Sequence, residues 1–133
     1  MEKNYTGYEN CLRIYNVIND ARAKYKESYM INYGKTPAID YCLNLKENNY
    51  QGYLPSIGQL KIMSDNIHII NYIFKYLNFQ EINWGTNYWW ASIEHSDKFA
   101  WPLTVNTISN TYSKYYEFKI FPLFAHMKNV TNL

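Results

Sequence analysis

The hydrophobic residues of the chain change their spacing near Asn78, and this change limits the folds open to it. Before Asn78, apolar residues recur every three or four positions, as on one face of an amphipathic helix. After it, stretches of alternating apolar and polar residues are typical of strands. Helices followed by antiparallel strands predict an α+β fold, with N-terminal helices packed on a small antiparallel sheet.

Two helices are predicted in the first 52 residues. Thr36-Pro37 marks the start of the second helix, because a cap residue followed by proline favours a first helical turn. The buried stripe of this helix is expected at Ala38, Tyr41, Cys42 and Leu45. The helix is expected to end at Asn48, Asn49 and Gly52. The first helix begins either at Asn10 as N-cap or at the capping box of residues 6–9. Its expected buried stripe is Ile14, Val17, Ile18, Ala21 and Tyr25.

Two shorter helices are expected between Pro55 and Asn78. Ser56 and Gln59 have the spacing of a capping box, which predicts a helix start at this point. Asp65-Asn66 is expected to end the first of these helices and separate it from the second. The apolar stripes expected to face the core are Leu60, Met63 and Ile67, then Ile70, Ile73, Phe74 and Leu77.

Two strands are predicted in the last third. In the first, the apolar face is expected to contain Phe99, Trp101, Leu103 and Val105. In the second, it is expected to contain Tyr116, Phe118, Ile120 and Pro122. The stretch 106–113 is rich in Asn, Thr and Ser and is expected to form a turn or loop.

Length and charge exclude several classes of protein. A chain of 133 residues predicts a single domain over residues 1–133, either as a whole protein or as the last domain of a longer one. Thirteen basic and eleven acidic residues give a net charge of +2, too balanced for a nucleic-acid partner. No apolar stretch is long enough to span a membrane, and no signal segment follows Met1.

The sequence shows no sign of catalysis, metal binding or a cofactor. Phosphate-loop, GxGxxG, GxSxG and HExxH motifs are all missing. Glu94 and His95 are adjacent, so on a strand they would point to opposite faces. Cys11 and Cys42 lack metal-ligand spacing, and they are either a disulfide or two buried thiols.

Five segments in order resemble a family of bacterial extracytoplasmic domains with a C-type-lectin-like fold. They are residues 6–11, 38–42, 53–60, 89–101 and 120–124. Some members of this family are variable proteins of diversity-generating retroelements, in which adenine-directed mutagenesis diversifies a C-terminal stretch. The resemblance implies a C-type-lectin-like fold, a non-catalytic ligand-binding function, and a place outside the cell, on its surface or on a phage particle. The implied partner is an unknown protein or a surface glycan.

Several residues depart from the family pattern. Cys11 stands where the family usually has Thr, and Gln59 where it has Glu. Phe121 and Phe124 stand where Arg is usual, and exposed phenylalanines are costly unless they are covered or bind something. The calcium and sugar signatures of C-type lectins are missing, and carboxylates are few, so calcium-dependent sugar binding is not expected.

Two sets of residues carry the functional hypotheses. Trp90 and Trp101 are expected to anchor the sheet against the helices. The full structural set is Leu54, Pro55, Trp90, Ser92, Glu94 and Trp101. Ligand contacts are expected from side chains exposed on strands and loops, namely Ile93, His95, Asp97, Lys98, Phe99, Pro102, Thr104, Asn106, Tyr112 and Tyr115.

From the resemblance we expect a variable protein of a diversity-generating retroelement that displays a ligand-binding surface on its C-terminal strands and loops. Two alternatives remain. One is a carbohydrate-binding or adhesion domain with a fixed site, because Tyr and Trp rings pack on sugars and Asn supplies hydrogen bonds. The other is an enzyme. Formylglycine-generating enzymes resemble the fold class, but their reactive cysteine pair lies near the C-terminal region, and here both cysteines fall within the first 42 residues. An enzyme is therefore not expected.

Overall fold

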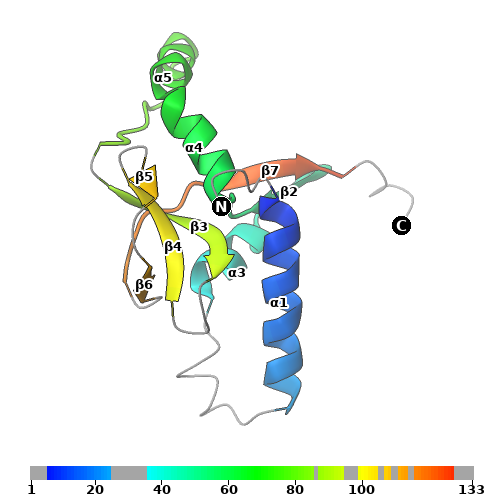
Figure 1. The fold of residues 1–133 in the computed structure, drawn as a ribbon. Helices are drawn as coiled ribbons and strands as arrows, with labels where there is room; N and C mark the ends of the chain where they lie inside the picture. Colours follow the sequence, from blue (N-terminus) through cyan, green and yellow to red (C-terminus); the bar gives the residue numbers. More distant parts are fainter. Residues whose placement is uncertain are drawn as a thin grey trace.

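The structure, a computed structural model, combines helices with two small sheets (Figure 1). It describes residues 6–24, 36–85, 87–94, 99–104, 107–108, 111–113 and 116–127. Within these ranges the helices are α1 (Gly7–Lys24), α3 (Pro37–Asn44), α4 (Ile57–Asp65) and α5 (Ile67–Tyr76). The fold is mixed α+β, and no helix in these ranges is long and apolar enough to cross a membrane.

Both sheets are antiparallel. The first has the order β1-β2-β7, formed by Lys46–Glu47, Tyr50–Tyr53 and Leu123–His126. The second has the order β3-β4-β5, formed by Tyr88–Glu94, Phe99–Thr104 and Thr107–Ile108, and β6 (Tyr112–Ser113) also pairs with β4. A strand close to the C-terminus thus pairs with β2 from the first half of the chain.

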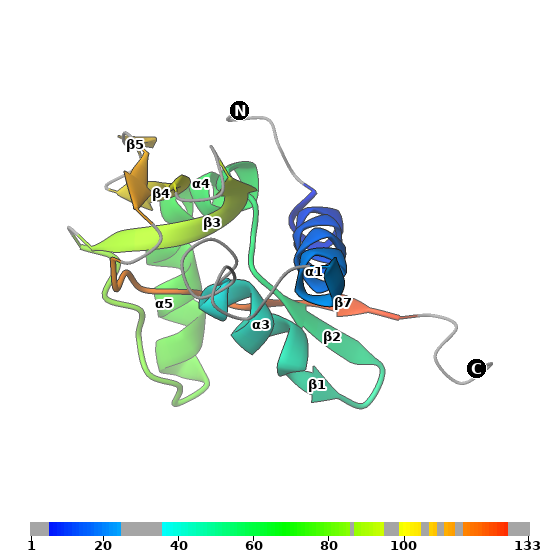
Figure 2. The same ribbon diagram turned by 90° about the horizontal axis from the view of Figure 1, so that it is seen from below.

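Strands β3 and β4 are buried on both faces. On one face, Trp90 and Ala100 pack in a cluster with Cys11 of α1 and Ile39 of α3. On the other face, Trp89, Ala91 and Leu103 pack against Ile57 and Leu60 of α4. Figures 1 and 2 place β3 between β4 and α1. The second sheet is therefore the layer that joins the two halves of the core.

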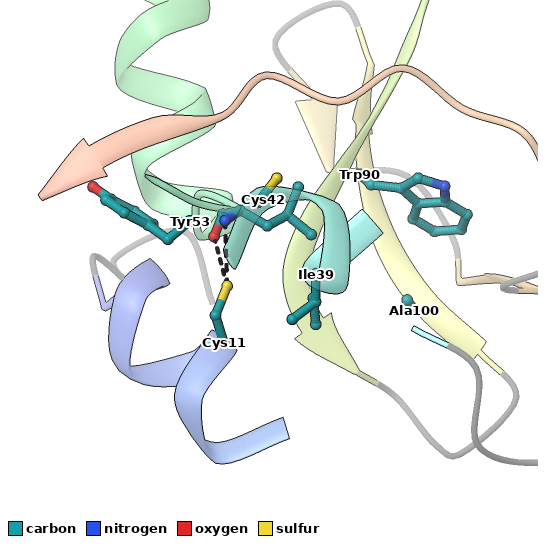
Figure 3. Close-up of a cluster of buried hydrophobic side chains, with 7 residues drawn as sticks. Cys11, Ile39, Cys42, Tyr53, Trp90 and Ala100 are labelled. Carbon is teal, nitrogen blue, oxygen red and sulfur yellow. Dashed lines mark hydrogen bonds between the residues drawn. The ribbon is translucent and has the colours of Figure 1, made fainter. Parts of the chain in front are cut away.

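A buried corner at residues 54–56 connects the sheets and helices. Ser56 caps α4: its side chain accepts from the Gln59 N–H, and the Gln59 side chain accepts from the Ser56 N–H at 3.0 Å. The carbonyl of Pro55 accepts the N–H of Ser92 in β3 at 2.8 Å. Cys11 Sγ donates to the carbonyl of Leu54 and accepts its N–H, each at 3.3 Å (Figure 3).

Three of the local start and stop signals in the sequence are confirmed. Pro37 opens α3 after Thr36, the capping box opens α4, and the break comes at Asn66, which caps the end of α4 before α5 starts. Helix α1 begins at Gly7, so Asn10 is inside the helix and the Asn10 N-cap alternative is wrong. Helix α3 ends at Asn44, earlier than the expected end at Asn48, Asn49 and Gly52, because Leu45 is already extended and strand β1 starts at Lys46. Asn48 instead adopts a positive φ of 54° in the β1–β2 hairpin turn.

The expected buried stripes are wrong at several positions. Val17 is 61% exposed and Tyr41 is 57% exposed. Helix α1 instead packs its first half against the core. The packed residues have the same spacing as the expected stripe but lie seven residues, or two turns, earlier: Gly7, Asn10, Cys11 and Ile14. Helix α5 has no buried residue, and Ile73 and Leu77 are exposed. Tyr25 lies outside the described residues.

The strand predictions are partly confirmed. Residues 99–104 form β4, but Ala100 and Pro102, expected to point to solvent, are buried because both faces of β4 are covered. The stretch 116–122 is not a strand. It makes one isolated parallel bridge, Lys119 to Trp89, and the strand itself starts at Leu123, after Pro122. The expected loop at 106–113 contains the short strands β5 and β6.

The close packing of α1 on the corner predicts that Gly7→Ala is destabilising. A Cβ at this position would overlap Gln59 Oε1 and lie 2.7 Å from the Ser56 nitrogen. Overpacking of this kind costs about 1–3 kcal/mol, against a helix-propensity gain of at most about 1 kcal/mol. Denaturant unfolding followed by tryptophan fluorescence measures the loss. The matched control, Asn16→Ala on the exposed side of α1, should be neutral or slightly stabilising, and equal stability of the two variants would contradict the packing.

Candidate ligand-binding site

Backbone hydrogen bonds attach the segment around Lys119 to strand β3. The N–H of Lys119 donates to the carbonyl of Tyr88 at 3.0 Å, and its carbonyl accepts the N–H of Trp90 at 2.9 Å. These two bonds hold the segment parallel to β3. They bring the ring of Phe118 next to the rings of Tyr88 and Trp90.

Four aromatic residues gather around Phe118, and we call the five together the aromatic cluster: Tyr88, Trp90, Tyr112, Tyr116 and Phe118. Phe118 stacks between Tyr88, at a centroid distance of 4.8 Å, and Tyr116, at 5.5 Å, with 19° between the planes in each pair. Trp90 lies 4.7 Å from Phe118, tilted by 42°. The cluster is therefore a stack of rings packed against a tryptophan of the buried core.

Tyr112 closes one side of the stack. Its ring is edge-on to Tyr88, Tyr116 and Phe118, at centroid distances of 5.3, 5.6 and 5.3 Å. Its hydroxyl lies 3.4 Å from the hydroxyl of Tyr88. Edge-on and offset pairs are the favoured arrangements of aromatic rings, so the geometry of the stack is fixed from two directions.

The side chains of the aromatic cluster range from buried to exposed. Trp90 is buried, Tyr88, Tyr112 and Phe118 are half-buried, and Tyr116 is 56% exposed. Beside Tyr116, the side chain of Glu117 is also exposed. An exposed ring on a fixed stack, with phenolic hydroxyls near it, suits stacking on an apolar surface together with hydrogen bonding.

The expected structural residues lie mostly in the core. Leu54, Pro55, Trp90 and Ser92 are buried, and Ser92 Oγ accepts the Asn10 side-chain amide at 3.4 Å. Trp101 is only half-buried, so of the two expected anchors Trp90 alone belongs to the buried core. Glu94 is exposed at the end of β3.

The expected ligand residues that the structure describes do not gather in one place. Tyr112 joins the aromatic cluster, and Thr104 is half-buried on β4. Ile93 is half-buried against the cluster that contains Leu103. Pro102 was expected at the surface, and this is wrong, since it is fully buried. The backbone of Phe99 belongs to β4, and His95, Asp97, Lys98, Asn106 and Tyr115 lie outside the described residues.

Sequence reasoning missed three members of the cluster as site residues. Tyr88 directly precedes the Trp89-Trp90 pair, and Tyr116 and Phe118 alternate, a pattern that was interpreted as a core-facing strand. The density of aromatic residues at positions 112–118 was the available signal. Phe121, one of the departures from the family pattern, is half-buried and packs edge-on against Trp89 at 6.3 Å, whereas Phe124 is exposed.

The two cysteines are free and buried. Burial raises the pKa of Cys11 from 9.0 to about 11, against the lowering effect of its hydrogen bonds to Leu54 and Ser92. Burial, together with the nearby Cys11, raises the pKa of Cys42 to about 12. The thiolate is the form of cysteine that acts as a nucleophile or binds a metal. Because both pKa values are raised, both thiols stay protonated and unreactive at neutral pH. Among the described residues, no group of three or more His, Cys, Asp or Glu is placed to hold a metal ion.

The raised thiol pKa values predict a loss of stability in alkali. The folded state binds these protons more tightly than the unfolded chain, so the contribution is complete below pH 9.0 and is lost as the pH rises through about 11 for Cys11 and about 12 for Cys42. At about 1.4 kcal/mol per pH unit, ionisation of Cys11 costs on the order of 3 kcal/mol. The free energy of unfolding, measured by denaturant titration at a series of pH values, should fall over this range.

Cys42→Ala is the matched variant for this prediction. Its lost packing lowers stability equally at every pH, whereas removal of the thiol removes one alkaline titration. The difference between the native protein and the variant should therefore shrink above pH 9.0. A difference that stays constant with pH would show that Cys42 does not have a raised pKa.

Comparison with known proteins identifies no relative of the chain. The chain matches no protein-family model, no curated protein and no solved structure. The likeness to C-type-lectin-like domains therefore depends on the five sequence segments alone.

Proposed function

We propose that the chain is a non-catalytic ligand-binding module that holds its ligand against the aromatic cluster. The observation that carries the proposal is the exposed ring of Tyr116, stacked on Phe118 at 5.5 Å. A tyrosine already fixed by its neighbours loses little side-chain entropy on binding. It also offers a large contact area with a polar end, as in the binding surfaces of antibodies.

The sequence resemblance supports a C-type-lectin-like fold for this module. The mixed α+β architecture, with helices on small antiparallel sheets, belongs to the class that this fold requires. Under this proposal the C-terminal strands form the display surface, and the buried Trp90 and Ser92 are framework residues. The module is placed outside the cell, on the cell surface or on a phage particle, as the resemblance implies.

The more specific form of the proposal is a variable protein of a diversity-generating retroelement, with a protein or another surface molecule as ligand. In that case the DNA around the gene should contain a reverse transcriptase and a near-identical copy of the last third of the coding sequence. Differences between the two copies should fall at adenines of the template copy. If sequencing of the region finds neither element, the retroelement form of the proposal is wrong. The proposal of a ligand-binding module is then tested only by the binding measurements below.

The alternative is a carbohydrate-binding or adhesion domain with a fixed site. It is favoured by the chemistry of the cluster, because aromatic faces pack on sugar rings and the hydroxyls of Tyr88 and Tyr112 lie within 3.4 Å of each other. Selective hits on a glycan array would favour this alternative. Hits confined to a displayed peptide library would favour a protein ligand.

The site itself predicts that Tyr116→Ala weakens binding more than it weakens the fold. Loss of the ring contacts with Phe118 and Tyr112 lowers stability by about 1 kcal/mol, whereas loss of an aromatic anchor commonly costs about 2 kcal/mol or more, about thirtyfold in affinity. Binding is measured for the hits from the glycan array or the peptide library, and thermal unfolding is measured in parallel. Tyr41→Ala, which removes an equally exposed ring on α3, is the control. If Tyr116→Ala binds as tightly as Tyr41→Ala, the site is wrong.

A further inference from the structure

Helix α5 extends away from the rest of the fold. None of its residues is buried, and Figure 1 shows it beyond the end of α4, at the top of the molecule and away from β6. Its ten residues, IHIINYIFKY, are nevertheless mostly apolar or aromatic. A helix of this composition is expected to be covered on more than one side.

One side of α5 is covered by the chain that follows it. The side-chain amide of Asn71 donates to the carbonyl of Ile82 at 2.9 Å and accepts the Ile82 N–H at 2.7 Å. Phe74 packs edge-on against Phe79, with a centroid distance of 6.0 Å. These contacts fix the orientation of the helix, and they leave the other side open.

The open side is a continuous apolar stripe at helical spacing: Ile69, Tyr72, Ile73 and Tyr76. These residues stand at i, i+3, i+4 and i+7, so they lie on one face of the helix. Tyr72 is 74% exposed and Tyr76 is 80% exposed, and the two isoleucines are exposed as well. The only formal charge on the helix is Lys75, so little opposes burial of the stripe.

We propose that this stripe pairs with the same stripe of a second copy of the chain, with the two α5 helices antiparallel about a two-fold axis. The order of the residues makes the stripe complementary to itself. With the axis between Tyr72 and Ile73, Ile69 faces Tyr76 of the second copy, and Tyr72 faces Ile73 of the second copy. Each contact then places an aromatic ring against an aliphatic side chain, and the two helix dipoles are opposed.

The area available is sufficient for such a pair. Leu77, which directly follows Tyr76, is also exposed. Given about 150–250 Å² for each aromatic side chain, the five exposed side chains offer roughly 600 Å² per partner, the lower end of specific interfaces, as expected for a pair that dissociates on dilution. A charged partner protein would find few complementary charges on this helix, whereas a second copy brings a matching apolar face. The proposal does not depend on the proposed ligand-binding function.

Mass in solution tests the pairing. Sedimentation velocity over a concentration series should give a species of twice the 16.0 kDa chain mass that dissociates on dilution. Tyr72→Lys places two like charges on either side of the axis, so it should weaken the pair by at least about a hundredfold. Val17→Lys, which places the same charge on the exposed face of α1, should leave the pair unchanged.

Cross-linking tests the register independently. Ile73→Cys lies next to the proposed axis and should form a disulfide-linked pair of chains under mild oxidation, whereas Val17→Cys should not. Cys11 and Cys42 are buried and should not contribute. A single species of 16.0 kDa at every concentration, or a pair that persists in Tyr72→Lys, would overturn the proposal.

Discussion

The hydrogen bond from the Ser92 N–H to the Pro55 carbonyl, 2.8 Å long, fixes how the two sheets lie relative to each other. It joins the corner after β2 to the middle of β3, and Cys11 Sγ joins the same corner to α1 through Leu54. Because buried backbone groups must be paired, these bonds leave the corner little freedom. The position of β3, and with it the aromatic cluster on its edge, follows from this arrangement.

Two residues that differ from the pattern the sequence resembles, Gln59 and Cys11, both make hydrogen bonds at this corner. Gln59 closes the capping box with its oxygen and donates its amide nitrogen to the Tyr53 hydroxyl at 3.0 Å. A glutamate has no such donor. Cys11 both donates and accepts at Leu54, as a threonine hydroxyl would, so a thiol fills the role with weaker hydrogen bonds.

The sequence predicted what is decided locally. The capping box at Ser56, the start at Thr36-Pro37 and the break at Asn66 depend on neighbouring residues, and all are confirmed. The choice of buried helix face depends on which distant element packs there, and here the prediction failed at Val17 and Tyr41. Of the candidate site, Tyr112 and the supporting Trp90 were found. Tyr88, Tyr116 and Phe118 were not, because they meet through a parallel pairing thirty residues apart along the chain, which leaves no periodic pattern in the sequence.

The attachment of the Lys119 segment has a consequence for how the protein can change. Both bonds that hold it to β3 use main-chain atoms of Lys119, and any residue other than proline supplies the same N–H and carbonyl. The Lys119 side chain is exposed, with its ammonium 5.9 Å from the centroid of the Trp89 ring, and Glu117, beside Tyr116, is exposed as well. A substitution at Glu117, which makes neither bond, can therefore alter the chemistry bordering Tyr116 while the path of the backbone stays the same, so evolution can vary this border without rebuilding its support.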